Sequence, residues 1–398
     1  MVWIRLQIRD WCYLWRISRL FVTRSIVVQL AWVKMPYMSC KIFATIIAAI
    51  AACAVQAQYK PSSSTRSTAP PNSAEVRIGG AGSPTIYPLL SAWIDEYSRL
   101  HQGTPISYMA IGSKAGIRLL SNRKVLFAVT DVAISDDELR PKGPILDLPV
   151  ALNAIVPVYN LSQASKLRLS GSTLAGIFLG KITKWNDPAI ANDNPGVALP
   201  QTDIKVHHYF PNGSPETRVM ADYLSKVSPE FESVLAKSSS DWPLPNYRYK
   251  GAEVAEFFRE TLGSIGYVPL AMAIARPESR GSSLRYAAVR NSDGEFVTAS
   301  SASVTEASAS AMASLQIHVP DFRISITNAP GRLSYPITSF TWILLYDDPT
   351  EKKENEAMGE FVKWVLTDGQ KLAAKLGYPT LPSNLVDIEL LRLKFGAQ

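Results

Sequence analysis

The strongest constraint on the fold is an alternation of strand-like and helix-like segments at the start of the folded region. Three short apolar segments have the composition of strands, and the two segments between them have apolar residues at helical spacing. The strand-like segments are 74–80, 105–111 and 125–134, and the helix-like segments are 87–100 and 114–122. This order predicts a parallel, doubly wound α/β sheet. Ligands of such sheets bind at the carboxyl ends of the strands.

Two longer apolar segments, 151–161 and 334–348, have the composition of buried strands and lie far apart in the sequence. The chain between them contains enough helical and strand-like segments for a second lobe, and the folded region exceeds the size at which chains usually divide. We therefore predict mixed sheets in two lobes, joined by these segments as two crossover strands. Lobe 1 is expected to comprise 75–156 and 335–398, and lobe 2 to comprise 157–334.

Three other segments also carry predictions of secondary structure. Residues 264–275 are predicted to form a strand, and the Ala/Ser-rich segment 291–317 a surface helix. Residues 354–378 form an amphipathic pattern, which predicts a helix that returns to lobe 1.

Small hydroxyl side chains lie in the loops at the carboxyl ends of the first predicted strands. In lobe 1 these are Ser83, Thr85 and Ser113, and Lys114 follows the last of them. Hydroxyls and backbone amides at a helix start can hold an oxyanion by their dipoles alone. Lys114 could add a positive charge there or remain a solvated side chain. The ordinary alternative for each hydroxyl is a helix N-cap.

A fourth loop, PNGSPETRV at 211–219, has the same character in lobe 2. Gly213, Ser214 and Thr217 could contribute an amide and hydroxyls to an anion. However, Pro215 has no N–H group, and Glu216 places a negative charge where an anion would lie. Ser at the cap, Pro at the first position and an acid near the helix dipole also make a favourable helix start without any ligand.

Asp131 follows the third predicted strand and is expected at the same edge of the sheet. A carboxylate among anion donors is repulsive unless the ligand brings a proton to share, as a monohydrogen oxyanion does. The alternative is a strand-end Asp that caps a turn.

No cofactor or catalytic metal is predicted. Residues 79–85 lack the third Gly of a dinucleotide fingerprint, and the chain contains no HExxH or GxSxG motif. The four histidines do not have metal-ligand spacing. A secreted phosphatase would need a nucleophile and base, or a metal set, and neither is evident.

The N-terminal region predicts export. The segment 38–58 contains Lys41, an apolar stretch over 42–55 and small residues before Gln58, which is typical of a cleaved signal. We expect an upstream extension plus export signal over 1–57 and a flexible linker over 58–74. An alternative route acylates Cys53, because the preceding residues resemble a lipoprotein box. A retained membrane anchor is disfavoured because the apolar stretch is short.

The charge of the chain does not indicate a nucleic-acid partner. The formal net charge is +7, but residues 1–57 hold seven basic side chains and one acidic side chain. The remaining residues carry 34 basic and 33 acidic side chains, so no net basic patch is expected. All three cysteines also lie within 1–57. After cleavage the chain would have no thiol chemistry.

Several motifs resemble the phosphate-binding proteins of bacterial phosphate ABC transporters, the PstS family. The most specific is LSGSTLAGIFLGKITKWNDPAI at 169–190, and GSIGYVPLA at 263–271 and SYPITSFTWIL at 334–344 agree with it. The resemblance extends from about Val76 to the C-terminus. It implies a type II periplasmic binding protein fold, in which two lobes close on one ligand and deliver it to a membrane permease.

The resemblance also implies site residues in lobe 1. Ser113 and Asp131 match ligand positions of the family, and Asp131 matches the acceptor for the phosphate proton. Pro84 stands at the position of the family's Thr, and Thr85 lies one place later.

The match in lobe 2 is less complete. The family pattern is Arg-x-Asp-Gly-Ser-Gly-Thr; Gly213 and Ser214 match it, whereas Pro215 and Glu216 replace Gly and Thr. Residues 207–212 contain no Arg. These departures predict weaker phosphate binding than in typical members.

The sequence therefore predicts a monomeric, exported periplasmic binding protein rather than an enzyme. Its expected ligand is inorganic phosphate or a similar oxyanion, and its expected partner is an ABC permease in the inner membrane. The competing hypothesis is a divergent paralogue that kept the fold, lost the ligand and acts as an interaction or sensing module.

Overall fold

A mixed sheet of seven strands, in the order β2-β1-β3-β10-β4-β7-β6, organises the residues that the structure describes. The computed structural model describes 77–101, 103–135, 145–207, 214–237, 253–274, 284–314, 322–346 and 352–396. All of them belong to one compact unit, Ser73–Gln398. The predictions for the export signal, the linker, the cysteines and Gly213 fall outside the described residues.

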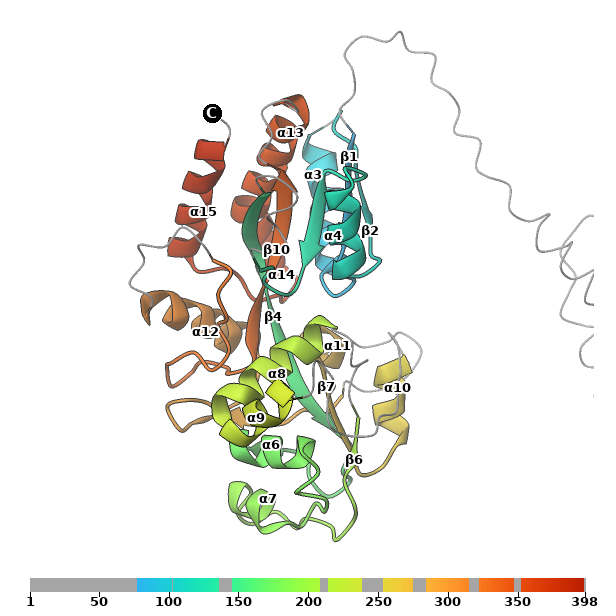
Figure 1. Ribbon diagram of the computed structural model, residues 1–398, viewed down its shortest axis with the longest axis vertical. Helices are drawn as coiled ribbons and strands as arrows, with labels where there is room; N and C mark the ends of the chain where they lie inside the picture. Colours follow the sequence, from blue (N-terminus) through green and yellow to red (C-terminus); the bar gives the residue numbers. More distant parts are fainter. Residues whose placement is uncertain are drawn as a thin grey trace, which may run out of the picture. The chain divides into compact units, whose positions relative to one another are not determined.

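The predicted β-α-β-α-β order is confirmed at the start of the sheet (Figure 1). Its elements are β1 (Ile78–Gly82), α3 (Tyr87–Leu100), β2 (Ile106–Met109), α4 (Ser113–Ser121) and β3 (Phe127–Thr130). β1 pairs with both β2 and β3 in parallel. One expectation is corrected: β1 continues to Gly82, beyond the predicted strand 74–80, so the loop that follows it begins at Ser83.

Two long strands continue the sheet in the antiparallel sense. β4 (Ile145–Tyr159) pairs with β10 (Thr338–Tyr346) over its first part and with β7 (Ser264–Pro269) over its last five residues. β10 also pairs with β3, which completes the mixed sheet. The change of partner on β4 occurs between Ala154 and Ile155, where the Ile155 amide donates to the Ile337 carbonyl at 2.9 Å.

We call the part of the fold built on β1, β2, β3 and β10 the first lobe, and the part built on β6 and β7 the second lobe. The second lobe has a separate three-stranded sheet in the order β5-β8-β9. Its strands are β5 (Arg168–Leu169), β6 (Lys205–Val206), β8 (Ala288–Arg290) and β9 (Phe296–Val297). Its helices are α6 (Gly171–Phe178), α7 (Pro188–Asp193), α8 (Pro215–Val227), α9 (Pro229–Lys237), α10 (Glu253–Glu260) and α11 (Leu270–Ile274). The exact boundaries predicted for the lobes, after residue 156 and after residue 334, stay predictions.

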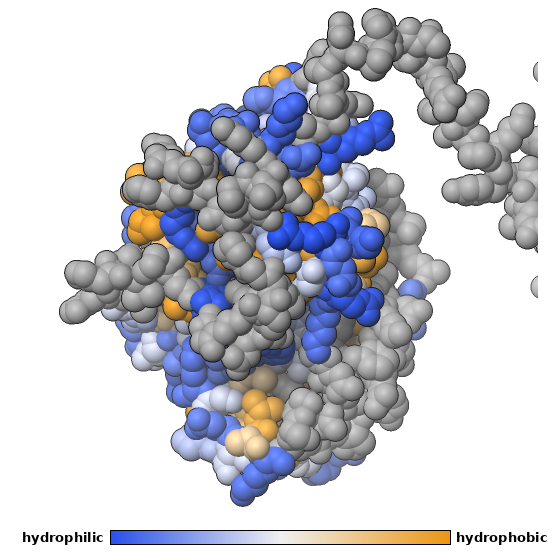
Figure 2. All heavy atoms as spheres, turned by 45° about the horizontal axis from the view of Figure 1, so that its top comes forward, coloured by the Kyte–Doolittle hydropathy of each residue, from blue (hydrophilic) through white to orange (hydrophobic). Residues whose placement is uncertain are grey.

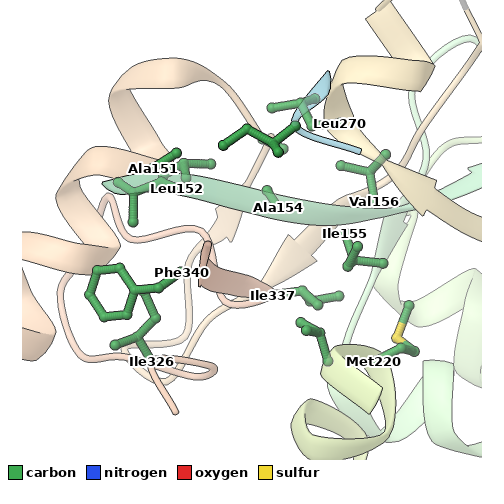
Figure 3. Close-up of a cluster of buried hydrophobic side chains, with 14 of the residues drawn as sticks. Ala151, Leu152, Ala154, Ile155, Val156, Met220, Leu270, Ile326, Ile337 and Phe340 are labelled. Carbon is green, nitrogen blue, oxygen red and sulfur yellow. The ribbon is translucent and has the colours of Figure 1, made fainter. Parts of the chain in front are cut away.

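The hydrophobic core is continuous along β4. Its buried members come from both lobes and include Trp93, Trp185 and Tyr267, each almost fully removed from solvent. Figure 3 shows the part of this core around β4, where Met220 of α8 and Phe340 of β10 lie among the labelled side chains. Burial of this apolar surface is the main force that stabilises the fold.

The C-terminal region packs on the first lobe, as predicted. It contains α13 (Lys352–Trp364), a π-helical turn (Val365–Gly369), α14 (Gln370–Lys375) and α15 (Ser383–Gly396). The indole N–H of Trp93 on α3 donates to the Gly369 carbonyl at 2.7 Å. Arg392 of α15 pairs with Asp147 of β4 at 2.9 Å and is joined there by Arg323. These contacts fix the C-terminal helices to the sheet.

Two predictions of secondary structure are corrected. The strand predicted over 264–275 ends at Pro269, and helix α11 follows it. The Ala/Ser-rich segment 291–317 contains β9 and a helix, α12 (Ser301–Ser314), which is not a surface helix throughout. Ser308 and Ala307 are fully buried, because small side chains allow this face of α12 to approach β4 and β10.

The surface of the described residues is mixed in character. On the face in Figure 2, hydrophilic residues predominate and hydrophobic residues lie in separate groups. None of the helices that the structure describes is long and apolar enough to cross a membrane.

Candidate functional site

Asp131 is the best-defined polar group at the carboxyl ends of the first strands. It follows β3 directly and is 1% exposed. Ser83, which follows β1, donates its hydroxyl to Oδ2 of Asp131, and Thr341 of β10 donates to Oδ1 at 2.6 Å. Strands β1 and β10 are the two neighbours of β3 in the sheet, so adjacent strands deliver both donors to the same carboxyl group.

The environment of Asp131 makes it a proton acceptor near neutral pH. Burial raises the pKa of this carboxyl from 3.8 to about 6, because the ionised form loses its hydration. The hydroxyls of Ser83 and Thr341 oppose this rise, and the nearby negative charge of Glu216 adds to it. A carboxylate has about four acceptor positions, so Asp131 can still accept a proton donor from a ligand.

Close backbone packing brings the loop after β1 next to β3 and next to the start of α4. The Ser83 amide donates to the Val129 carbonyl at 2.9 Å, and the Gly112 amide donates to the Gly82 carbonyl at 2.8 Å. A Cβ atom on Gly82 would lie 2.1 Å from the Val129 oxygen, and one on Gly116 would lie 2.5 Å from the Ala81 oxygen. Only glycine fits at these two positions, because a side chain at Gly82 would clash with the β3 backbone and one at Gly116 would separate α4 from β1.

Helix α4 begins beside this group without a side-chain cap. Its N-cap is Gly112, with φ of 97°, which makes no side-chain cap hydrogen bond. Ser113 is 5% exposed, and its hydroxyl has no hydrogen-bond partner among the residues that the structure describes. Lys114 is exposed at the second position of the helix. An uncapped helix start with a buried, unpartnered hydroxyl has the properties of an anion site.

Helix α8, in contrast, has its own cap. Ser214 accepts from the Thr217 amide at 3.2 Å and donates to the Thr217 hydroxyl at 3.1 Å. Thr217 is buried, and its hydroxyl also lies 2.8 Å from the Tyr267 hydroxyl. The second-lobe hydroxyls predicted for the site are therefore engaged with each other and with β7.

Glu216 connects the two lobes. Its Oε1 accepts a hydrogen bond from the Thr85 hydroxyl at 3.1 Å, and the Thr85 amide donates to the Ser83 hydroxyl at 3.0 Å. Glu216 is 7% exposed. A hydrogen-bonded path therefore runs from Asp131 through Ser83 and Thr85 to Glu216.

The structure brings Ser83, Thr85 and Asp131 into one group, and Ser113 starts the helix beside it. Sequence reasoning missed Thr341, and it treated Glu216 either as a repulsive charge or as the acid at a favourable helix start. Ser339 and Thr341 alternate along β10, and both donate to Asp131, Ser339 to its backbone carbonyl at 3.3 Å. Hydroxyls at positions i and i+2 of a strand share one face, and this spacing was the available signal.

The other charged candidates lie at the surface. Lys205 and Arg218, the Lys and Arg side chains that flank the second-lobe loop in sequence, are both exposed. Within the same described ranges, no group of three or more His, Cys, Asp or Glu side chains could hold a metal ion.

The class of the protein follows from the fold and from comparison with known proteins. The PBP superfamily domain matches residues 65–369. A phosphate-binding protein from Stenotrophomonas maltophilia superposes with a TM-score of 0.58 at 16% identity, covering 80% of this chain and 94% of that chain. An ABC-type phosphate transport receptor from Vibrio cholerae gives a TM-score of 0.51 at 16% identity, covering 77% and 100%. The fold is that of the two-lobe periplasmic binding proteins.

A sequence relative narrows this class to one family. The phosphate-binding protein PstS of Xylella fastidiosa is 39% identical over 327 residues, which cover 80% of this chain and 86% of the relative. The chain belongs to the PstS family, as its motifs predicted.

Proposed function

We propose that the protein captures inorganic phosphate or a related oxyanion for an ABC importer. The observation that carries this proposal is the pairing of Asp131, a buried proton acceptor, with the uncapped start of α4 and its unpartnered Ser113 hydroxyl. The names of its relatives, a phosphate-binding protein and a phosphate transport receptor, support the same function.

This arrangement favours oxyanions that carry a proton. The amides of α4 and the Ser113 hydroxyl can donate to the negative oxygens of a ligand, whereas Asp131 can only accept once it is ionised. Phosphate and arsenate keep a proton at neutral pH and can donate it to Asp131. Sulfate has no proton to donate, so its oxygen would face a carboxylate. The site should discriminate against sulfate by this repulsion.

The second lobe weakens the attraction for an anion. A unit charge at 4 Å contributes about 4 kcal/mol at an effective dielectric constant of about 20, and Glu216 supplies that charge with the unfavourable sign. Binding at micromolar affinity corresponds to only about 8 kcal/mol in total. We therefore expect phosphate affinity below that of relatives with an arginine in this loop.

Titration calorimetry of the purified protein with phosphate, arsenate and sulfate tests this function. We expect one site per chain that binds phosphate and arsenate and rejects sulfate. Equal binding of sulfate would contradict the role of Asp131. Absence of heat with all three anions, together with unchanged thermal stability, would favour the ligand-free interaction or sensing module instead.

The setting of this function is part of the proposal. We propose that the chain is exported through its N-terminal signal to the periplasm, with acylation at Cys53 as the alternative route. We further propose that it acts as a monomer, with lobes at 75–156 plus 335–398 and at 157–334, and delivers its ligand to an inner-membrane ABC permease. Intact mass of the mature protein distinguishes the two processing routes.

A further inference from the structure

Glu216 brings a second carboxyl group to the group that contains Asp131. It reaches the first lobe through Thr85, whose hydroxyl it accepts at 3.1 Å. Thr85 in turn is hydrogen-bonded to Ser83, and Ser83 donates to Asp131. Both carboxyl groups are more than nine-tenths buried. Solvent therefore screens their repulsion weakly.

We infer that Glu216 is a specificity-determining residue that makes this site select the dihydrogen form of an oxyanion. The inference rests on the proposed function. A dihydrogen oxyanion has two O–H donors, one for Asp131 and one for Glu216, and an ionised carboxylate can only accept. Its remaining oxygens are free to accept from the Ser113 hydroxyl and from the first amides of α4. A monohydrogen oxyanion leaves one carboxylate facing a negative oxygen.

Counting protons gives this selection a measurable form. The complex holds two protons shared among the ligand and the two carboxyl groups. Above about pH 8, free phosphate carries mainly one proton, so a site with two ionised carboxyl groups must take up one proton from solvent when it binds. The affinity then falls about tenfold for each pH unit, because one proton is linked to binding. With a single carboxyl group at the site, the same reaction takes up no proton.

Other groups around the site must be considered in the same pH range. Tyr108 donates its hydroxyl to the Ser83 carbonyl at 2.9 Å, and burial raises its pKa, so it stays protonated. The adjoining elements also carry titratable or charged side chains, which are Tyr267 on β7, Lys114 and Arg118 on α4, and Arg218, Asp222, Tyr223 and Lys226 on α8 itself. A comparison of the wild type with a variant at Glu216 leaves all of these groups in place. The difference in slope between the two proteins therefore reports on Glu216 and the ligand.

The test is a calorimetric titration of phosphate into the full chain and into the Glu216→Gln variant between about pH 7 and pH 9. Above about pH 8 we expect the dissociation constant of the wild type to rise about tenfold per pH unit, with a shallower rise nearer pH 7, and that of Glu216→Gln to stay constant within about twofold. Glu216→Thr should behave as Glu216→Gln does, which guards against an effect specific to the amide. Glu232→Gln, at an exposed position of α9, removes one charge from the same lobe and should keep the wild-type slope.

The outcomes separate the inference from the proposed function. If the wild type and Glu216→Gln show the same slope, Glu216 does not share a ligand proton and the inference is wrong, although phosphate binding stands. If the two Glu216 variants fold, as judged by their unfolding transitions, and neither they nor the wild type binds phosphate, the proposed function fails as well. A parallel titration that detects proton uptake by its dependence on buffer ionisation heat should give about one proton for the wild type and none for the variants.

Discussion

Replacing Asp131 by Asn should stabilise the protein above neutral pH while it weakens oxyanion binding. Burial raises the pKa of Asp131 from 3.8 to about 6. One pKa unit corresponds to about 1.4 kcal/mol, so ionised Asp131 lowers the free energy of unfolding by about 3 kcal/mol. Asparagine has nearly the same shape and carries no charge. Its amide can accept from one hydroxyl of the Ser83 and Thr341 pair and donate to the other, because hydroxyl hydrogens rotate.

The pH dependence of this gain has a defined sign. The folded-state pKa of Asp131 is raised, so the unfolded chain ionises first as the pH increases, and wild-type stability is lost between about pH 4 and pH 6. The Asn variant does not titrate at this position. The free energy of unfolding of the variant should therefore exceed that of the wild type only slightly near pH 4. The difference should reach about 1 to 3 kcal/mol at about pH 8, after allowance for imperfect hydrogen-bond geometry of the amide.

Urea unfolding of both proteins at several pH values, followed by tryptophan fluorescence, measures this difference. The midpoint should move to higher urea for Asp131→Asn at alkaline pH, and the two curves should approach one another in acid. A variant less stable than the wild type at about pH 8, or a difference that does not change with pH, would refute the reasoning. Calorimetry on the same samples should show weaker binding of phosphate than in the wild type.

Two other substitutions probe the surroundings of Asp131 and a remote ion-pair cluster. Thr341→Val removes a 2.6 Å hydrogen bond to the Asp131 carboxylate. It should lower the free energy of unfolding by about 1.5 to 3 kcal/mol at about pH 8. The same urea titrations should show a smaller loss below the pKa of Asp131. Asp147→Asn neutralises the buried partner of Arg323 and Arg392 and should lower the free energy of unfolding by about 3 kcal/mol. Calorimetry should find phosphate affinity unchanged in this variant, because Arg392 lies on α15 and Asp147 lies in the far part of β4. A comparable loss of affinity would show that the cluster acts on the site through Arg323, which donates to the Ile134 carbonyl at 3.3 Å.

The sequence predicted those parts of the fold and site that local patterns control. The β-α-β-α-β order, the crossing of β4 and the adjacency of Ser83 and Asp131 all follow from apolar periodicity and from the rule that parallel strands end at one edge. Each of these features involves strands that lie side by side in the sheet, and the β-α-β-α-β order of the sequence predicts which strands are neighbours.

The missed features depend on contacts between distant segments. Glu216 of the second lobe accepts a hydrogen bond from Thr85 of the first lobe, and no local sequence pattern predicts this contact. Thr341 reaches Asp131 because β10 lies between β3 and β4, which the sequence order of the strands does not reveal. Helix α12 is half-buried because small residues permit close approach, whereas composition alone made it resemble a surface helix.

The continuity of β4 has a consequence for any attempt to divide this protein. Its first part completes the sheet of one lobe and its last five residues complete the sheet of the other. A cut at Ala154 would leave each fragment with a shortened strand and an open sheet edge, which is prone to pair with other chains. We expect such fragments to aggregate when expressed separately and to recover a native-like structure only when they are expressed together.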